Sequence, residues 1–342
     1  MKASIKPRIN LDNRTPLQEV IPLSTPFVLF VDPVNTCNFQ CKFCPTGDRD
    51  LIRSTGRWQG RLDFDTYRKL IDDLGEFDQP LKVLRLYKEG EPLLHTRFAD
   101  MVRYAKESGH VRYIDTTTNG YLLTPDRVGP ILDAGIDRIN ISVDGMSSEQ
   151  YWEFTQTRVD FERFVENIRK LYERKGDCEI CVKIPGDILG EEDKRRFYGI
   201  FGEIADRVFI ENFAPCWPSF DVEERTGIEI TEGIYGNAIH DIKTCPYIFY
   251  SMAVNTDGSV SLCFLDWARK LPIGDVRAES LKSIWNGDAM RRHRIAHLSG
   301  CRKDDPTCAA CGQLSHCLPD NIDAYADRLL ERIDPLPLRK AA

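Results

Sequence analysis

The sequence has no long apolar run and no excess of positive charge. No apolar segment approaches the roughly 18 residues that a membrane-spanning helix needs, and the amino-terminal segment MKASIKPRINLDNRTPLQ lacks the hydrophobic stretch of a signal peptide. The 46 Lys and Arg against 53 Asp and Glu give a net charge of −7, which disfavours binding to nucleic acid or to anionic lipid. We therefore expect a cytoplasmic protein that binds neither membranes nor nucleic acids.

Cysteine is too scarce for a fold held together by disulfides, yet it is clustered. The 12 cysteines among 342 residues lie well below the roughly 8–10% of a disulfide scaffold. In a reducing compartment, clustered cysteines are more often metal ligands or catalytic groups than disulfides. The composition, with 42% hydrophobic and 29% charged residues, is that of an ordinary globular protein. The clustered cysteines are therefore the residues that point to function.

Apolar strands alternate with amphipathic helices over residues 26–215. Strands are predicted at 26–35, 81–87, 111–117, 138–143, 179–184 and 207–213, and helices at 64–77, 97–108, 124–135, 161–175 and 191–205. This alternation indicates crossover units and a parallel sheet. Because six units fall short of the eight in a complete barrel, we predict an α/β fold with a partial (β/α)6 TIM-like barrel, with a doubly wound sheet as the alternative.

The alternation stops after about residue 215. A β-hairpin is predicted over 252–263, with Asp257-Gly258 as its turn, followed by a helix over 281–298. We therefore predict an N-terminal extension (1–25), a barrel (26–215), a connector (216–240), a small α+β domain (241–322) and a C-terminal tail (323–342) that begins with a short helix.

The first cysteine group is the segment CNFQCKFC, which directly follows the first predicted strand. Cys37, Cys41 and Cys44 can close on one centre, but structural zinc takes four ligands and no fourth Cys or His lies nearby. A complete [4Fe–4S] cluster uses four thiolates, so three thiolates would leave one iron open to an exogenous ligand. Because barrel enzymes react where their strands end, this spacing favours a reactive cluster. A structural zinc completed by a remote residue is the alternative.

The C-x3-C-x2-C spacing, with Phe43 before the last cysteine, resembles the signature of the radical S-adenosylmethionine (radical SAM) superfamily. The resemblance covers about residues 26–215, where Gly90-Glu91-Pro92, Asn119 and Ser142 stand at strand ends as they do in that family. It implies that Cys37, Cys41 and Cys44 hold a [4Fe–4S] cluster whose open iron binds S-adenosylmethionine.

The same resemblance implies roles for the residues at the strand ends. The backbone of Gly90, Glu91 and Pro92 would hold the methionyl amine, and Ser142 would lie near the ribose. Glu89 stands where the family commonly has another glycine, so this loop departs from the family pattern.

The second cysteine group is formed by Cys245, Cys263, Cys308 and Cys311. Four thiolates would fill a metal site completely, and their spacing alone admits zinc as well as an iron–sulfur cluster. The pattern C-x12-G-x4-C followed by C-x2-C resembles the auxiliary-cluster domain of the SPASM and twitch subfamilies. Because no cysteine follows Cys317, and Asn321 stands where one would be expected, the resemblance implies a single auxiliary [4Fe–4S] cluster, as in the twitch variant.

Other titratable residues carry weaker patterns. We interpret the pair Cys178 and Cys181 as core residues, His293 and His297 as part of a solvated basic helix face, and Lys183 as outward-facing on its strand. Cys301 and Cys317 are expected at the periphery of the second cluster.

These features predict a radical SAM oxidoreductase with two [4Fe–4S] clusters and S-adenosylmethionine. A 5′-deoxyadenosyl radical would take a hydrogen atom from a small hydroxylated substrate, such as a sugar or an aminocyclitol. The auxiliary cluster would accept an electron as an alcohol becomes a ketone. A one-electron reductant such as flavodoxin or ferredoxin is implied as a partner.

Three alternatives stay open. The first is an epimerase in which Cys216, which follows the sixth strand, donates a hydrogen atom as the catalytic residue. The second is a peptide-modifying enzyme, which is less expected because only about 25 residues precede the first strand. The third is a non-catalytic binding module held together by zinc.

Overall fold

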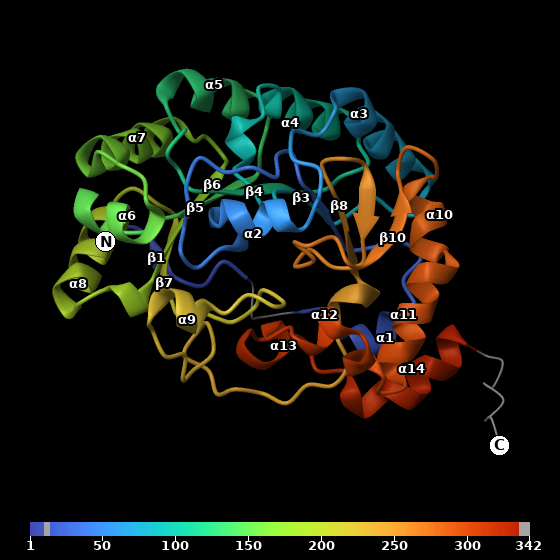
Figure 1. Ribbon diagram of the computed structural model, residues 1–342. Helices are drawn as coiled ribbons and strands as arrows, with labels where there is room; N and C mark the ends of the chain where they lie inside the picture. Colours follow the sequence, from blue (N-terminus) through green and yellow to red (C-terminus); the bar gives the residue numbers. More distant parts are fainter. Residues whose placement is uncertain (10–13, 335–342) are drawn as a thin grey trace.

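The computed structural model describes residues 1–9 and 14–334, and its strands join in one ten-stranded sheet (Figure 1). The strand order is β1-β7-β6-β5-β4-β3-β2-β8-β9-β10. In this spatial order, the first eight strands, which end with β8, run parallel to their neighbours. Strand β9 pairs antiparallel with both β8 and β10. The strand bounds are β1 Ser4–Ile5, β2 Val28–Val31, β3 Val83–Leu86, β4 Ile114–Thr118, β5 Arg138–Ser142, β6 Glu179–Pro185, β7 Arg207–Glu211, β8 Ser251–Val254, β9 Ser259–Ser261 and β10 Pro272–Asp275.

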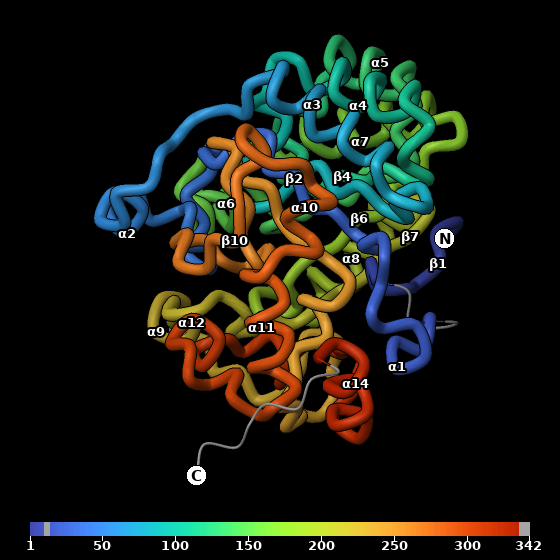
Figure 2. Tube along the Cα trace, turned by 90° about the vertical axis from the view of Figure 1, so that its right-hand side faces the viewer, coloured from blue at the N-terminus to red at the C-terminus, as the bar shows by residue number. Residues whose placement is uncertain are grey.

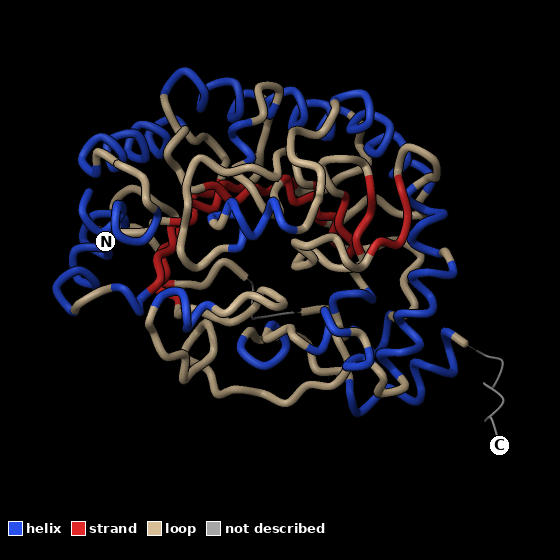
Figure 3. The backbone as a smooth tube through the Cα atoms, in the orientation of Figure 1, coloured by secondary structure: helices blue, strands red, loops and turns tan. Residues whose placement is uncertain are grey.

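The six strands predicted from the sequence are β2 to β7, and they lie side by side in chain order. This arrangement confirms the partial barrel. Helices α3 (Phe64–Asp73), α4 (Phe98–Glu107), α5 (Pro125–Asp133), α7 (Phe161–Arg174) and α8 (Glu191–Phe201) connect the strands. They lie outside the curved row of strands (Figure 3).

The two faces of the barrel sheet differ in polarity because side chains alternate along a strand. In β6, Ile180, Val182 and Ile184 belong to the hydrophobic core, while Glu179 and Lys183 lie on the other face. Glu179 pairs there with Arg138 of β5. The inner face of the barrel therefore carries charged side chains at β5 and β6.

The C-terminal segment extends the barrel sheet and does not form a sheet of its own. Strand β8 pairs in parallel with β2, and the predicted hairpin turns at Asp257-Gly258, where Gly258 has φ +86°. At the opposite edge of the sheet, β1 pairs with β7. Parts of the predicted extension and of the predicted auxiliary domain thus belong to the same sheet as the barrel.

The remaining helices are α1 Leu17–Val20, α2 Arg49–Ser54, α6 Ser148–Thr155, α9 Val222–Thr226, α10 Leu281–Asn286, α11 Asp288–Leu298, α12 Pro306–Ala309, α13 Gln313–His316 and α14 Ala326–Ile333. Helix α2 protrudes from the body (Figure 2). None of the helices in residues 1–9 and 14–334 has the length and hydropathy of a transmembrane span.

Two helix predictions differ from the structure. The single helix expected over 281–298 is wrong, because Gly287 adopts an extended conformation (φ −72°, ψ 162°) between α10 and α11. Glycine is a poor helix former, and Asp288 favours a new helix start. Helix α6 was not predicted, because Tyr151 and Thr155 are its only buried residues and its apolar periodicity is weak.

Candidate active site

Cys37, Cys41 and Cys44 lie on the loop between β2 and α2. The end of α6 anchors this loop, because the backbone N–H of Gln40 donates to the Thr155 carbonyl and that of Lys42 to the Phe154 carbonyl, both at 2.9 Å. Burial raises the pKa of Cys37 to about 12 and raises the pKa of Cys41 well above its ordinary value. Since thiolates are the metal ligands, these three thiols would release their protons when a cluster binds.

Two glycines allow neighbouring loops to lie directly against the cysteine loop. A Cβ on Gly47 would lie 2.3 Å from the Cys41 carbonyl oxygen, and one on Gly90 would lie 2.1 Å from the Val34 carbonyl oxygen. Gly90 was predicted at the site, but Gly47 was missed. Its only signal in the sequence is a glycine three residues beyond the last cysteine of the group.

Glu91 joins the ends of two strands through a fully buried carboxylate. This carboxylate accepts hydrogen bonds from the Leu93 N–H (2.9 Å), the Thr118 hydroxyl (2.8 Å) and the Asn119 N–H (2.8 Å). Its own N–H donates to the Thr36 carbonyl at 3.0 Å. Burial raises the pKa of Glu91 to about 7 despite these three donors. Its side chain therefore shapes the loop, and Pro92 begins a short 3₁₀ helix there.

Asn119 is brought against the cysteine loop. Its amide nitrogen donates to Asn38 Oδ1 at 2.9 Å and lies 3.7 Å from Cys37 Sγ. Phe43 contacts a different part of the barrel, since its ring packs 5.0 Å from that of Phe213. The predicted residues of this region thus converge around the three cysteines.

Ser142 ends β5 and lies in register with Lys183 of β6. Lys183 forms an ion pair with Glu211 at the end of β7 and lines a cavity inside the barrel. The expectation that Lys183 faces outward is therefore wrong. Lys183 lies between the core residues Val182 and Ile184 in β6, and because side chains alternate along a strand, it points toward the inner face. Nearby, burial raises the pKa of Asp144 to about 7, and Lys183 opposes this shift.

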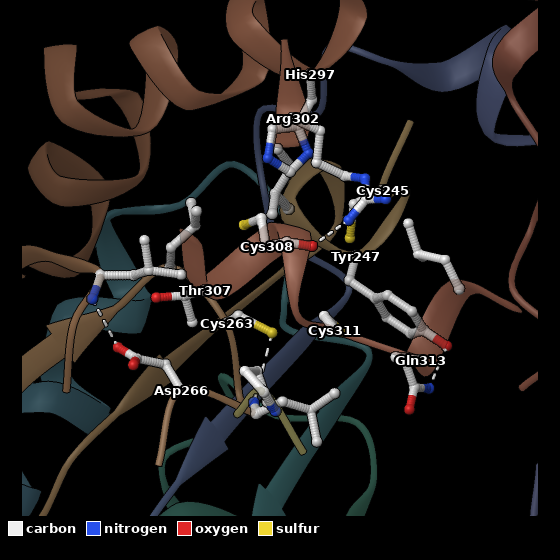
Figure 4. A pocket seen from close by; sticks show the side chains of 16 residues that line it. Cys245, Tyr247, Cys263, Asp266, His297, Arg302, Thr307, Cys308, Cys311 and Gln313 are labelled. Atoms are coloured by element: carbon white, nitrogen blue, oxygen red, sulfur yellow. Dashed lines mark hydrogen bonds between the residues drawn. The ribbon is translucent and has the colours of Figure 1, made fainter. Parts of the chain in front are cut away.

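The second cysteine group also comes together. Cys245, Cys263, Cys308 and Cys311 line one cavity, shared with Arg302 and His297 (Figure 4). Cys263 follows the hairpin, Cys308 lies in α12, and Cys311 follows α12.

The geometry of the second group fits a cluster better than a single ion, because its four thiols line one cavity. In residues 1–9 and 14–334, no three His, Cys, Asp or Glu side chains converge as a single metal ion requires. Zinc holds its sulfurs about 2.3 Å from one point, whereas a [4Fe–4S] cluster spreads its thiolates around a four-iron core. Thiols arranged around a shared space therefore suit an iron–sulfur cluster.

His297 was interpreted as part of a solvated helix face, and this is wrong. The residue is only 2% exposed, its Nδ1 is buried without a hydrogen-bond partner, and it lines the cavity of the second group. Burial lowers the pKa of His297 to about 3, so the ring is neutral. Cys301 is exposed, as expected for a peripheral residue, whereas Cys317 is buried.

Cys216 lies between the two cysteine groups. Its carbonyl oxygen is 3.8 Å from Cys311 Sγ, and the Gly312 N–H donates to the Pro215 carbonyl at 3.2 Å. The pKa of Cys216 is well above its ordinary value, chiefly because of burial and further because of Cys317, Cys311 and Cys44.

Glu89 is the centre of a buried ion network that the sequence did not reveal. Its side chain is fully buried and pairs with Lys88 and Arg57, which are also buried. Lys88 donates to the Asp266 carbonyl at 3.0 Å, and Arg57 donates to the Trp267 carbonyl at 2.9 Å. The residue that departs from the family pattern therefore joins the end of β3 to the segment that follows the hairpin.

Comparisons with known proteins agree with this geometry. Residues 31–196 match the model of the "Radical SAM superfamily", and residues 245–312 match the SPASM "Iron-sulfur cluster-binding domain". An AdoMet-dependent heme synthase of Methanosarcina barkeri is 30% identical, with 85% of this chain and 89% of the relative covered. A tungsten-containing aldehyde ferredoxin oxidoreductase cofactor-modifying protein of Pyrococcus furiosus is 30% identical over 122 residues, which is 36% of this chain and 32% of that protein. The chain thus spans about a third of one relative and nearly nine-tenths of the other.

Solved structures share the fold. BtrN in complex with AdoMet and 2-DOIA has a TM-score of 0.55 at 18% identity, covering 87% of this chain and 97% of BtrN. The structure of anSMEcpe with bound AdoMet has a TM-score of 0.57 at 14% identity, covering 90% and 97%. The radical SAM domain uses a [4Fe–4S] cluster and S-adenosylmethionine, and the SPASM domain binds further iron–sulfur. These matches exclude the alternative of a non-catalytic binding module held together by zinc. The chain is an enzyme of the radical SAM superfamily with a C-terminal SPASM domain.

Proposed function

We propose that this enzyme oxidises an alcohol of a small hydroxylated substrate, a sugar or an aminocyclitol, to a ketone. The observation that carries the proposal is the polar barrel interior at the strand ends, next to both cysteine groups. Ser142, Lys183 and Glu211 meet there, and each is at or near the end of a different strand. Such a lining offers hydrogen bonds to the hydroxyl groups of a polar ligand.

The residues at this edge match the needs of the cofactors. Cys37, Cys41 and Cys44 would hold the first cluster, with S-adenosylmethionine against Gly90, Glu91, Pro92, Asn119 and Ser142, and Cys245, Cys263, Cys308 and Cys311 would hold one auxiliary cluster. When bound, these groups supply a 5′-deoxyadenosyl radical and a one-electron acceptor. A one-electron donor such as flavodoxin or ferredoxin would reduce the first cluster.

Asp144 is our candidate for the proton acceptor. Oxidation of the alcohol removes a hydrogen atom from carbon, a proton from oxygen and one further electron. Asp144 is 4% exposed and lies near Lys183 and Glu211. Because burial raises its pKa to about 7, it can take up and release a proton near neutral pH.

An apolar cluster beside the cysteine loop excludes water from this edge. Phe213, Phe220 and Val222 are buried together, with Phe43 and Trp217 packed against them. These side chains come from the cysteine loop, the end of the barrel and the predicted connector. Exclusion of water protects a radical from side reactions.

The test is anaerobic reconstitution followed by assay of 5′-deoxyadenosine. We expect a panel of polyols to contain at least one that stimulates its formation and yields a product two mass units lighter. Cys308→Ser should contain about half of the iron and should form no ketone, but it should still cleave S-adenosylmethionine. Cys41→Ser should no longer cleave S-adenosylmethionine. Cys301→Ser, at an exposed position, is the control. A product of unchanged mass would overturn the oxidation.

The second candidate is epimerisation with Cys216 as hydrogen-atom donor. The observation in its favour is the place of this thiol between the two cysteine groups. Under epimerisation, Cys216→Ala should abolish solvent-deuterium incorporation at the product carbon. Under oxidation, the same variant should keep forming ketone.

A further inference from the structure

We propose that the substrate carries an anionic group, a carboxylate or a phosphate, and that Arg8 binds this group inside the barrel. The inference rests on the proposed function only in taking the barrel interior as the substrate site. It adds to that function the charge of the substrate and the residue that recognises it.

The N-terminal segment carries Arg8 to the inner face of the barrel. Residues Ser4 and Ile5 pair with β7 (Figure 1), and the Lys6 N–H donates to the Val208 carbonyl at 3.3 Å. From there, Arg8 Nη1 donates to the Tyr87 hydroxyl at 2.6 Å. Tyr87 directly follows β3, so the guanidinium reaches the level at which the barrel strands end.

Arg8 is a buried cation that forms an ion pair with none of the acids in the described part of the chain. In residues 1–9 and 14–334 it forms no ion pair, and its Nε is buried without a hydrogen-bond partner. The carboxylates around it are engaged by other cations: Glu211 by Lys183, Asp115 by Arg85, and Glu179 by Arg138 and Arg207. Tyr87, Tyr235, Glu211 and Asp115 together raise the pKa of Arg8 although burial lowers it, so the guanidinium stays charged. Its unpartnered Nε could therefore donate a charge-assisted hydrogen bond to an anionic ligand.

The space next to Arg8 is lined by cations and neutral groups. Arg8, Lys183, Arg207, Asn140, Cys181 and Phe209 line a small cavity, and none of its lining residues is acidic. Asn140 uses its amide nitrogen on the Thr116 carbonyl at 2.9 Å. The planar, forked guanidinium of Arg8 suits the two oxygens of a carboxylate or phosphate.

The same cavity gives the substrate an orientation. Lys183 both lines it and lies in register with Ser142, the residue expected near the ribose of S-adenosylmethionine. An anionic group held at Arg8 would therefore place the rest of a small substrate toward the strand ends. Arg8 acts here as a specificity-determining residue and takes no part in the chemistry.

Binding to the reconstituted holoenzyme with S-adenosylmethionine tests the proposal without turnover. The probes are glucose, glucuronate, glucose 6-phosphate and inorganic phosphate, measured by calorimetry. We expect at least one anionic probe to bind more tightly than glucose by roughly 10- to 100-fold, the effect of one charge-assisted bidentate contact. Comparison of glucuronate with glucose 6-phosphate decides between carboxylate and phosphate.

Variants then assign the effect to Arg8. Arg8→Gln should remove the preference for anions, while an iron content equal to that of the parent shows that the variant has folded. Arg8→Lys keeps the positive charge but lacks the two-pronged guanidinium, so it should retain part of the preference for anions. Arg112→Gln, at an exposed position, is the control for net charge. Equal binding of glucose and all the anions, or an unchanged preference in Arg8→Gln, would overturn the proposal, whereas absence of alcohol oxidation would bear only on the proposed function.

Discussion

The carboxylate of Glu91 accepts a hydrogen bond from the backbone N–H of Asn119, which ties the loop after β3 to the end of β4. Asn119 in turn reaches Asn38 beside the first cysteine. The three loops at the carboxyl edge of β2, β3 and β4 are thereby held in one arrangement by hydrogen bonds within the protein. Such preorganisation is what a site for a labile radical requires.

Replacement of Glu91 tests this arrangement. Glu91→Gln keeps the shape but loses the negative charge that accepts three hydrogen bonds, so we expect a loss of about 1–3 kcal/mol in the free energy of unfolding. The Kd for S-adenosylmethionine should rise, while iron content stays near that of the parent. Glu107→Gln, at an exposed position of α4, is the control. Unchanged stability and affinity would contradict the role of this carboxylate.

Asp144 predicts the pH dependence of the reaction. Because burial raises its pKa to about 7, the carboxylate is the minority form below that pH and the majority form above it. As a proton acceptor works only when deprotonated, kcat/KM for the substrate should rise with pH through about 7. Asp144→Asn should abolish ketone formation while basal cleavage of S-adenosylmethionine continues. A pH profile that is flat between 6 and 8 would exclude this role.

We expect the site not to tolerate a side chain at Gly47 or Gly90, the two glycines that lie against the cysteine loop. Gly47→Ala and Gly90→Ala each place a Cβ within 2.3 Å of a backbone carbonyl oxygen, a form of overpacking that costs roughly 1–3 kcal/mol. We expect lower iron and sulfide per chain after reconstitution of Gly47→Ala, and weaker S-adenosylmethionine binding for Gly90→Ala. Gly199→Ala, in α8 with open space around it, should behave as the parent protein. Full cluster content in Gly47→Ala would show that the loop can move aside.

Glu89 predicts an outcome opposite to the one that the family pattern implies. Glu89→Gly restores the glycine common in the family but removes the acid that pairs with the buried Lys88 and Arg57. Asp32 is then a buried acid that remains near them. Removal of one partner from a buried ion pair costs about 3–5 kcal/mol. Denaturant unfolding of the holoenzyme should therefore show a large loss for Glu89→Gly and a small one for Glu107→Gly. Equal stability of the two variants would mean that water or a counter-ion replaces Glu89.

Local patterns in the sequence were sufficient to predict the barrel strands and to identify the two cysteine groups. The six barrel strands and the hairpin at Asp257-Gly258 follow from periodicity and turn chemistry, which act over a few residues. Cys37, Cys41 and Cys44 lie on one short loop, so their spacing alone brings them together. The convergence of Cys245 and Cys263 with the pair Cys308 and Cys311 was expected only through the resemblance to SPASM and twitch domains.

Long-range packing decided the rest. The pairing of β8 with β2, the ion pair of Lys183 with Glu211 and the network around Glu89 join residues that are far apart in the chain or whose side-chain directions depend on the whole sheet. His297 lines the cavity of the second cysteine group because α11 packs against the segment after Cys245. The sequence by itself determined which elements form and which thiols can bind metal, because these depend on spacing between near neighbours. Only the tertiary structure decided which charges are buried together and that Arg8 pairs with no acid in residues 1–9 and 14–334, because that depends on where the curved sheet brings its strand ends.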